Sequence, residues 1–450
     1  MLSDPIVALA TPPGRAALAV LRLSGTGVNA VASRCLDPLP DPPRSVVRSR
    51  LRHPQTLETL DHCLAARYTG PRSYTGEDMI EVFTHGGLIV PAGALAAFVA
   101  AGARPAAPGE FARRAVLNGK LDLLQAEATA DLIEAGAPAQ RRLALQQLDR
   151  GLSHRLAALR GELLEIEALI AYDIDFPEED DGPVDTERVT HATRTARERI
   201  AQLVRTAPEG ERVRDGALLV IAGRPNAGKS SLFNALLGRE RAIVTDVPGT
   251  TRDAIEAPAV IEGFPFRLVD TAGLRESEDK VERMGIEVSR RYLGAADVVL
   301  FCEAVGEEGR GMGEETGREA FLPECTAPVL VVHTKCDLPF PLPSSPFPRV
   351  SAVTGEGLDV LKRKLADLAF GRLVAQGDVE PVVTRARHRV ALERALGEID
   401  AFEAARATCI EAAAAATHLR AAVGALDELI GVVTPDDVLE RVFATFCVGK

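Results

Sequence analysis

The chain has 450 residues, which is too long for a single hydrophobic core, so its length predicts two or three domains. Its 52 basic and 64 acidic side chains give a formal net charge of −12, which excludes a strong overall attraction for nucleic acid, and any RNA contact must be local. The seven cysteines lack CxxC spacing, which argues against a disulfide framework or structural zinc site and favours a reducing cytosol. We expect neither a signal segment nor a membrane span.

Two composition patterns divide the chain. Residues 1–118 alternate short β-like runs with turn clusters and helical patches such as 94–101, which predicts a compact α+β domain. From Leu121 the chain is rich in Ala, Leu, Glu and Arg, and apolar residues recur at steps of three and four from 145 to 170. This spacing predicts one long amphipathic helix that ends at the acidic, proline-containing run 175–183.

A second helix is expected over 185–207, followed by Glu209-Gly210-Glu211, which places a domain boundary near 212. After about 374 the chain is again rich in Ala and Leu. We therefore expect a multidomain chain with α/β and α+β folds, in which an α/β domain is inserted into a discontinuous helical domain. The predicted domains are 1–118, 119–212, 213–374 and 375–450.

A glycine-framed stretch, Gly223-Arg224-Pro225-Asn226-Ala227-Gly228-Lys229-Ser230, lies between the apolar run 217–222 and the helical pattern 232–237. Strand, glycine-rich loop and helix in this order are typical of a phosphate-binding loop. The glycines let successive N–H groups and the helix N-terminus point at one anion, Lys229 reaches the outer phosphates, and the Ser230 hydroxyl coordinates Mg²⁺. The sequence therefore predicts phosphate binding.

Further segments follow the phosphate loop in a fixed order. Thr250-Thr251 offers a threonine for Mg²⁺, and Asp270-Thr271-Ala272-Gly273 offers a carboxylate for the metal's water shell and an N–H for a γ-phosphate. Thr334-Lys335-Cys336-Asp337 and Ser351-Ala352-Val353 complete a set that resembles the five signature elements of translation-factor-like GTPases. The resemblance implies a Ras-like α/β GTPase domain whose Asp337 reads guanine. It implies GTP contacts from Asn226, Ala227, Gly228, Lys229, Ser230, Ser231, Thr245, Asp246, Val247, Pro248, Gly249, Thr250, Thr251, Asp270, Thr271, Ala272, Gly273, Thr334, Lys335, Asp337, Ser351, Ala352 and Val353.

Two positions depart from the usual pattern of such GTPases. Thr334 replaces an asparagine, which leaves Lys335 and Asp337 as stacking stem and base reader. Leu274 cannot orient the attacking water as a glutamine would, so another polar group must do so. We predict Glu282 as this catalytic group, acting through a bridging water from the start of a helix. The competing carboxylates are Glu276, Glu278 and Asp279.

Motifs outside the GTPase domain resemble the MnmE (TrmE) family of tRNA modification GTPases, and they span essentially the whole chain. They are Thr11-Pro12-Pro13-Gly14-Arg15, Leu21-Arg22-Leu23-Ser24-Gly25, Tyr74-Thr75-Gly76-Glu77-Asp78, His85-Gly86-Gly87, Pro108-Gly109-Glu110-Phe111, Leu117-Asn118-Gly119-Lys120-Leu121-Asp122-Leu123, Asp175-Phe176-Pro177-Glu178-Glu179 and Phe446-Cys447-Val448-Gly449-Lys450.

The resemblance implies a homodimeric, potassium-activated GTPase that works with the FAD-containing flavoprotein MnmG. The pair adds a carboxymethylaminomethyl-type group to C5 of uridine 34 in certain tRNAs, with a 5-formyl or 5,10-methylene tetrahydrofolate as one-carbon donor. An N-terminal folate-binding-like domain would form the dimer. Carried onto this sequence, the resemblance assigns Arg22, Glu81, Lys120 and Lys450 to folate, Ser230 and Thr251 to Mg²⁺, and Asn226, Thr245, Val247 and Thr250 to K⁺.

Alternatives stay open at this point. The chain could be a non-enzymatic GTPase switch in ribosome assembly or membrane attachment, or a folate-dependent methyl carrier with a degenerate nucleotide domain. Cys447 is a candidate nucleophile toward C6 of a uridine, although Phe443 and Phe446 favour an apolar setting that raises the pKa of its thiol. Four arginines, Arg385, Arg387, Arg389 and Arg394, are candidates for a local basic surface that binds tRNA and MnmG. The alternative is an ordinary solvated helix face.

Overall fold

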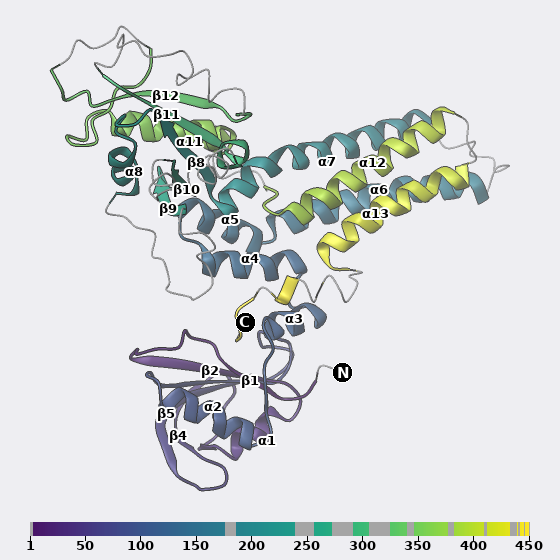
Figure 1. Ribbon diagram of the computed structural model, residues 1–450. Coiled ribbons are helices and arrows are strands. Elements are labelled where there is room, and N and C mark those ends of the chain that lie inside the picture. Colours follow the sequence, from purple (N-terminus) through teal and green to yellow (C-terminus); the bar gives the residue numbers. More distant parts are fainter. Residues whose placement is uncertain are drawn as a thin grey trace. The chain divides into compact units, whose positions relative to one another are not determined.

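The structure, a computed structural model, divides the chain into two compact units, Met1–Ala130 with Leu426–Lys450 and Asp131–Ala425. Both units mix helices with a sheet (Figure 1), so the predicted combination of α+β and α/β folds is confirmed. The residues that the structure describes are 3–175, 186–238, 256–271, 291–305, 325–339, 346–376, 382–408, 412–432, 439, 442–444 and 446–449.

The first unit contains a seven-stranded sheet in the order β3-β4-β5-β6-β2-β1-β7. Neighbouring strands are antiparallel except β1 and β7. The β-like runs expected at the N-terminus are confirmed by β1 and β2. The strands are β1 (Ile6–Leu9), β2 (Leu18–Ser24), β3 (Leu36–Asp37), β4 (Val46–Arg52), β5 (Thr59–Tyr68), β6 (Met79–His85) and β7 (Arg104–Pro105).

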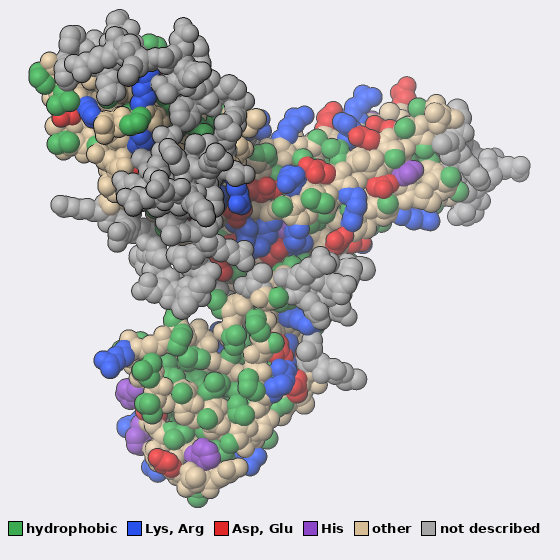
Figure 2. Space-filling view, viewed as in Figure 1, with side chains coloured by type: hydrophobic (Ala, Val, Ile, Leu, Met, Phe, Trp, Pro, Cys, Tyr) green, Lys and Arg blue, Asp and Glu red, His purple; other side chains and the backbone are tan. Residues whose placement is uncertain are grey.

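The two faces of this sheet differ. Helices α1 (Val28–Ser33) and α2 (Val90–Ala100) pack on one face, where alternate strand residues join their apolar side chains in one core. On the opposite face, Leu18, Val46 and Leu64 are 60%, 62% and 47% exposed. Figure 2 shows one side of this unit dominated by hydrophobic side chains. Helix α3 (Glu110–Leu117) covers the β1 end of this second face, where Phe111 is buried with Ile6 and Ala8, and the three exposed side chains lie outside that contact.

The C-terminal residues belong to the first unit. Phe443 and Phe446 stack edge to face with ring centroids 5.2 Å apart, and both are buried with Leu123 beside helices α3 (Glu110–Leu117) and α4 (Leu123–Glu134). Beyond them Val448 forms a bridge with Pro108. The chain's end is thereby fixed to the unit that begins the chain.

The second unit contains a five-stranded sheet in the order β12-β11-β8-β10-β9, parallel except for the β9–β10 hairpin. Apolar clusters cover both faces, as expected for a mostly parallel sheet. This arrangement is the α/β fold predicted for residues 213–374. Its elements are β8 (Ala217–Gly223), α8 (Lys229–Leu237), β9 (Glu256–Ile261), β10 (Phe264–Asp270), β11 (Val298–Ala304), β12 (Val329–Thr334) and α11 (Leu358–Gln376).

The same unit contains a bundle of long helices, in which α7 lies along α6 and α12 (Figure 1). Among the described residues, no helix is both long and apolar enough to cross a membrane. The predicted domain boundaries at 118, 212 and 374 stay predictions. The helices are α5 (Pro138–Leu148), α6 (Gly151–Asp175), α7 (Thr186–Asp215), α12 (Ala386–Ala407) and α13 (Ala412–Ile430).

The single helix predicted over 145–170 is wrong. The chain breaks between α5 and α6, where Arg150 adopts a left-handed backbone with φ 64°. A Cβ on the next residue, Gly151, would lie 3.0 Å from the carbonyl of Gln146. The apolar spacing continues across this turn, but Leu145 of α5 is 41% exposed whereas Leu152 and Leu156 of α6 are buried, so the two helices do not bury one continuous stripe.

The expected end of the following helix at 207 is also wrong, since α7 continues to Asp215 through Pro208. Gly210, which resembles a stop signal in the sequence, serves packing instead: a Cβ there would lie 2.1 Å from the carbonyl of Val383. The neighbouring Glu209 carboxylate accepts the N–H groups of Arg372 and Leu373. This glycine allows a second segment to lie directly against the helix.

Candidate functional site

The phosphate loop joins β8, the central strand of its sheet, to α8. Gly223 has φ 143°, and a Cβ there would lie 2.4 Å from the carbonyl of Cys302 on β11. Asn226 and Gly228 take positive φ values of 62° and 78°, and Gly228 caps α8. The loop therefore curls at the helix N-terminus, the geometry that aims N–H groups at phosphate.

Lys229 and Ser230, the side chains of this loop predicted to bind phosphate and Mg²⁺, each have a hydrogen-bond partner close by. Lys229 is buried, and its Nζ donates to the carbonyl of Arg224 at 2.7 Å. The Ser230 hydroxyl donates to Asp270 Oδ2, at the end of the adjacent strand β10, at 2.6 Å. A hydroxyl and a carboxylate side by side are oxygen donors of the kind that Mg²⁺ prefers, so this pair fits the expected metal.

Thr334 supplies a contact that the sequence did not reveal. Its hydroxyl donates to the carbonyl of Ala227 in the phosphate loop at 2.7 Å, and the carbonyl of Glu303 lies 3.2 Å from the same oxygen. The next residue, Lys335, has φ 60°. The threonine that replaces asparagine thus ties the segment of the predicted base reader to the phosphate loop.

The second predicted base segment is ordered by Ser351. This residue is buried, and its hydroxyl oxygen accepts the N–H groups of Val353 and Thr354 at 3.2 and 3.1 Å. Asp337 is exposed, so its carboxylate is accessible to a nucleotide base. The two segments meet where the N–H of Cys336 donates to the carbonyl of Val350.

Several predicted site residues lie outside the described residues, and their assignments stay predictions. They are Thr245, Asp246, Val247, Pro248, Gly249, Thr250, Thr251, Ala272, Gly273, Glu282 and Lys450.

The first unit brings two of the predicted folate residues together. Arg22 on β2 lies opposite Glu81 on β6, and Nε and Nη2 donate to the same carboxylate oxygen at 3.1 and 2.9 Å. The pair lies on the sheet face away from α1 and α2. Burial and then the Glu81 charge raise the pKa of Tyr68, whose hydroxyl donates to Glu81 at 3.4 Å. The arginine is thus held at mid-strand.

Aromatic rings and the C-terminus surround this arginine. The guanidinium carbon of Arg22 lies 5.1 Å from the ring centroid of Tyr74 and 5.8 Å from that of Phe111. Its Nη1 donates to the carbonyl of Gly449 at 3.5 Å. Gly449 has φ 102°, and a Cβ there would lie 2.6 Å from the carbonyl of Leu9, so the tail passes close to the sheet. Sequence reasoning missed both rings.

Lys120 is exposed and follows α3. A Cβ on Gly76 would lie 3.2 Å from its Cγ, so the lysine stem passes next to the 73–78 loop that carries Tyr74. Asn118 fixes this arrangement by donating to the carbonyl of Thr75 at 2.7 Å. The structure therefore places Arg22 and Lys120 near the same loop.

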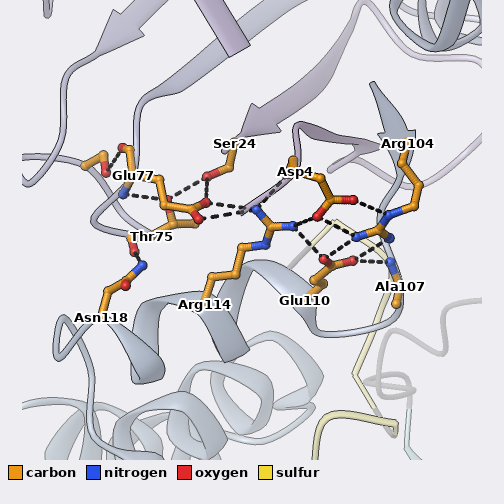
Figure 3. A network of polar contacts seen from close by, with 10 residues as sticks. Asp4, Ser24, Thr75, Glu77, Arg104, Ala107, Glu110, Arg114 and Asn118 are labelled. Carbon is orange, nitrogen blue, oxygen red and sulfur yellow. Dashed lines mark hydrogen bonds and ion pairs between the residues drawn. The ribbon is translucent and has the colours of Figure 1, made fainter. Parts of the chain in front are cut away.

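An ion-pair network holds that loop in place (Figure 3). Arg114 is 1% exposed and donates to Glu77 at 3.1 Å, Glu110 at 2.8 Å and Asp4 at 3.1 Å. Ser24 on β2 also donates to Glu77, at 2.8 Å. The buried arginine thus links the loop, helix α3 and the N-terminal segment.

The network favours ionised carboxylates. A hydrogen bond from Arg104 lowers the pKa of Asp4 despite burial. Burial opposes ionisation of Glu110, but hydrogen bonds from Arg104, the Ala107 N–H and Arg114 outweigh it and lower the pKa of that carboxyl.

Two expectations about other residues change. The apolar setting expected for Cys447 is wrong, because Phe443 and Phe446 are buried while Cys447 is exposed. The arginine cluster after 384 is not a free basic surface. Arg385 pairs with Asp131 at 2.6 Å, Arg389 pairs with Glu211 at 2.9 Å, and Arg387 and Arg394 also have partners. Basic and acidic side chains interleave along this helical part (Figure 2).

Comparison with known proteins identifies the family. Residues 5–120 match the family model for the GTP-binding protein TrmE N-terminus, and residues 123–447 match that for the MnmE helical domain. The tRNA modification GTPase MnmE of Aquifex aeolicus is 40% identical, over 100% of both chains. This chain belongs to the MnmE family. The MnmE of Methylorubrum populi is 44% identical, over 99% of this chain and 98% of its own.

The G domain of the T. maritima FeoB iron transporter is 27% identical over 34% of this chain and 98% of its own, with a TM-score of 0.23, too low to bear on the fold. Membership of the MnmE family makes the chain a tRNA modification GTPase and decides against the two alternatives, a GTPase switch without modification chemistry and a methyl carrier.

Proposed function

We propose that this MnmE family member acts in the cytosol as a homodimeric, potassium-activated GTPase with the FAD-containing flavoprotein MnmG. With a tetrahydrofolate derivative as one-carbon donor, it adds a carboxymethylaminomethyl-type group to uridine 34 of certain tRNAs. The observation that carries this proposal is the Arg22–Glu81 pair, which lies at mid-sheet beside Tyr74, Phe111 and the C-terminal residues.

This arrangement suits a reduced folate. The pterin ring offers adjacent N–H donors that one carboxylate, Glu81, can accept, and its flat face suits the rings of Tyr74 and Phe111. The glutamate tail carries carboxylates that Arg22, Lys120 and, at the chain's end, Lys450 can pair with. All contributing residues belong to the first unit.

Calorimetric binding of 5-formyltetrahydrofolate to the full chain tests the folate site. Arg22→Met and Glu81→Gln should each weaken binding by about tenfold or more, the loss expected for a charge-assisted hydrogen bond. Arg48→Met, on the same sheet face, is the matched control. A chain lacking Val448-Gly449-Lys450 should lose modification and keep GTP hydrolysis. Unchanged folate affinity in both point variants would refute the site.

The open sheet face supports the homodimer. Leu18, Val46 and Leu64 are exposed on the sheet face away from α1 and α2, and the same face carries Arg22 and Glu81. A second copy of the same unit would bury this apolar surface. Leu64→Asp should give monomers in sedimentation equilibrium, whereas Val360→Asp on α11 should not. A dimer that survives Leu64→Asp and Val46→Asp together would contradict this interface.

Among the described residues, Ser230 and Asp270 offer oxygen atoms that could hold Mg²⁺, and Asn226 offers one for K⁺. Mg²⁺ would neutralise phosphate charge, and Thr251 would complete its ligands. GTP hydrolysis should be faster in K⁺ than in Na⁺, and Asn226→Ala should remove that difference. Equal rates of the unaltered protein in both salts would contradict potassium activation.

Glu282 is the proposed water-positioning group. Glu282→Ala should lower single-turnover hydrolysis in saturating K⁺ by about 100-fold with little change in GTP affinity, because a water-orienting contact acts mainly in the transition state. Glu278→Ala is the control from the same segment. A near-normal rate for Glu282→Ala would assign the role to another group.

A further inference from the structure

Helix α5 contacts the two connections that join the GTPase sheet to the helices, and it also contacts one hairpin of that sheet. The chain enters this sheet from α7 through Asp215 and leaves it through α11 and the segment 382–385. Both connections pass α5, and a third contact reaches the hairpin between β9 and β10.

Gln140 binds the entering connection. Its Nε2 donates to the carbonyl of Arg214 at 2.9 Å, in the last turn of α7 where carbonyls lack helical partners. Its Oε1 accepts the N–H groups of Gly136 and Ala137 at 2.9 and 3.0 Å. The amide is therefore fixed at both ends between the start of α5 and the end of α7.

Gln147 binds the leaving connection. It lies seven residues after Gln140, on the same side of the helix, and is buried. Its Nε2 donates to the carbonyl of Val382 at 3.1 Å and to the hydroxyl of Thr384 at 3.0 Å. The Asp131 carboxylate reinforces the junction, since it accepts from Arg385 at 2.6 Å and from Arg214 at 3.3 Å.

The third contact leads toward the nucleotide. The Ala139 N–H donates to the carbonyl of Gly263, in the turn that starts β10, at 3.0 Å. Ala139 is buried in one core with Phe264 and Phe266 of that strand. Strand β10 ends at Asp270, which accepts the Ser230 hydroxyl. One strand therefore joins α5 to the predicted magnesium site.

The contacts of the two glutamines surround a cavity of about 200 Å³. Close packing is interrupted at this cavity, so hydrogen bonds contribute more to holding α5 against the two connections here than they would in a closely packed core. The cavity is lined in part by Asp131, Gln140, Gln147, Arg214 and Thr384.

We propose that Gln140 and Gln147 are positioning residues that couple GTP hydrolysis to tRNA modification. They hold α5 to both connections of the GTPase sheet, so that a movement of the sheet on hydrolysis carries α5 with it. This role rests on the tRNA-modifying function of the family and is independent of the folate site, since every residue it uses lies in the second unit.

The test is the double variant Gln140→Leu, Gln147→Leu, which removes both amides and keeps side-chain bulk. The full-length variant replaces the normal copy in a bacterial strain, and modified uridine in its tRNA is measured by mass spectrometry. GTP turnover is measured on the purified protein. We expect kcat and KM for GTP within about twofold of normal and a fall of at least about tenfold in modified uridine, the size of a lost coupling free energy. Arg141→Ala, on the exposed side of α5, should change neither.

Undiminished modification would overturn the proposal. A parallel fall of hydrolysis and modification would also overturn it, because a merely structural role reduces both. If the double variant does not fold, Asp131→Asn replaces it in the same two measurements, since it keeps the shape of the side chain and removes the charge between Arg214 and Arg385. The same separation of hydrolysis from modification is expected for it.

Discussion

The two sheets of the molecule offer different surfaces to ligands. Strand β8 is buried along nearly its whole length, and apolar clusters cover both faces of its sheet. In the described part of this sheet, Ser230, Asp270 and Thr334 lie beyond or at the ends of strands. In the first unit the sheet face away from α1 and α2 is only partly covered, and Arg22 and Glu81 occupy mid-strand positions on it. How a sheet is covered thus decides where its chemistry can lie.

The loops beside these sites are also held differently. Backbone geometry shapes the phosphate loop, through the left-handed residues Asn226 and Gly228. Charged side chains shape the 73–78 loop, through Arg114 and its carboxylate partners. Substitutions can therefore disable one site and spare the other.

The largest effect is expected for Lys229→Ala. The buried ammonium group is placed to stabilise phosphate charge, so kcat/KM for GTP should fall by at least about 10²–10³-fold. Folate affinity, measured by calorimetry, should stay unchanged because the lysine belongs to the other unit. The exposed Lys364→Ala serves as control, and a rate within tenfold of normal would show that Lys229 has no part in catalysis.

Arg114→Met should have the opposite effect, impairing the first unit and sparing GTP hydrolysis. It leaves Glu77 and Glu110 without their buried partner, and loss of one member of a buried ion pair costs about 3–5 kcal/mol. Urea unfolding should show this loss in the first unit, and folate binding should weaken, whereas GTP hydrolysis should continue. The exposed Arg15→Met is the control. A stability change below about 1 kcal/mol would mean that the network adds little.

Thr334→Val should have a moderate effect on the nucleotide alone. It removes the hydroxyl that binds the phosphate loop, a hydrogen bond of about 0.5–1.5 kcal/mol, so GDP affinity should fall about two- to tenfold. Thr334→Ser should retain the affinity. Release of a fluorescent GDP analogue measures both, and identical release from the valine and serine variants would contradict the role.

The smallest effect is expected on acidification. The pKa values of Asp4 and Glu110 are lowered in the fold from ordinary values of 3.8 and 4.5. Their stabilisation is therefore complete above those ordinary values and is lost as pH falls toward the folded values. The melting temperature of the first unit, measured by thermal unfolding, should therefore fall below about pH 4.5. Glu110→Gln should flatten this dependence, and a variant with the same pH profile as the unaltered protein would exclude Glu110.

Local sequence patterns were enough to predict an element when all the residues that determine it lie in one segment. The phosphate loop and strands β1, β2, β8 and β10 follow from glycine spacing, apolar runs and alternation. Helix ends were harder to predict. The apolar period runs unbroken past Arg150, although α5 and α6 are separated there. Gly210 within α7 resembles a helix stop signal, but a glycine is needed at this position because the backbone of Val383 lies against the helix. Tertiary contact overrides local signals at both places.

Pairings between distant segments could not be predicted. Arg114 pairs with Asp4, 110 residues earlier, and Gln147 bonds to Val382, 235 residues later. No periodicity relates such positions, so the network that holds the 73–78 loop and the contacts of α5 could be found only from the fold. Thr334 is a partial exception, because its departure from the usual asparagine marked the position without revealing its partner.

Gly210 has a practical consequence. Its missing side chain lets Val383 lie against α7, so the chain leaves the GTPase sheet close to where it entered. A segment whose two ends are neighbours can be removed and bridged by a short linker without stretching what remains. The helical bundle could therefore be expressed as a separate protein without the sheet. Ala139 and Leu143, which the sheet now covers, would then have to be replaced by polar residues.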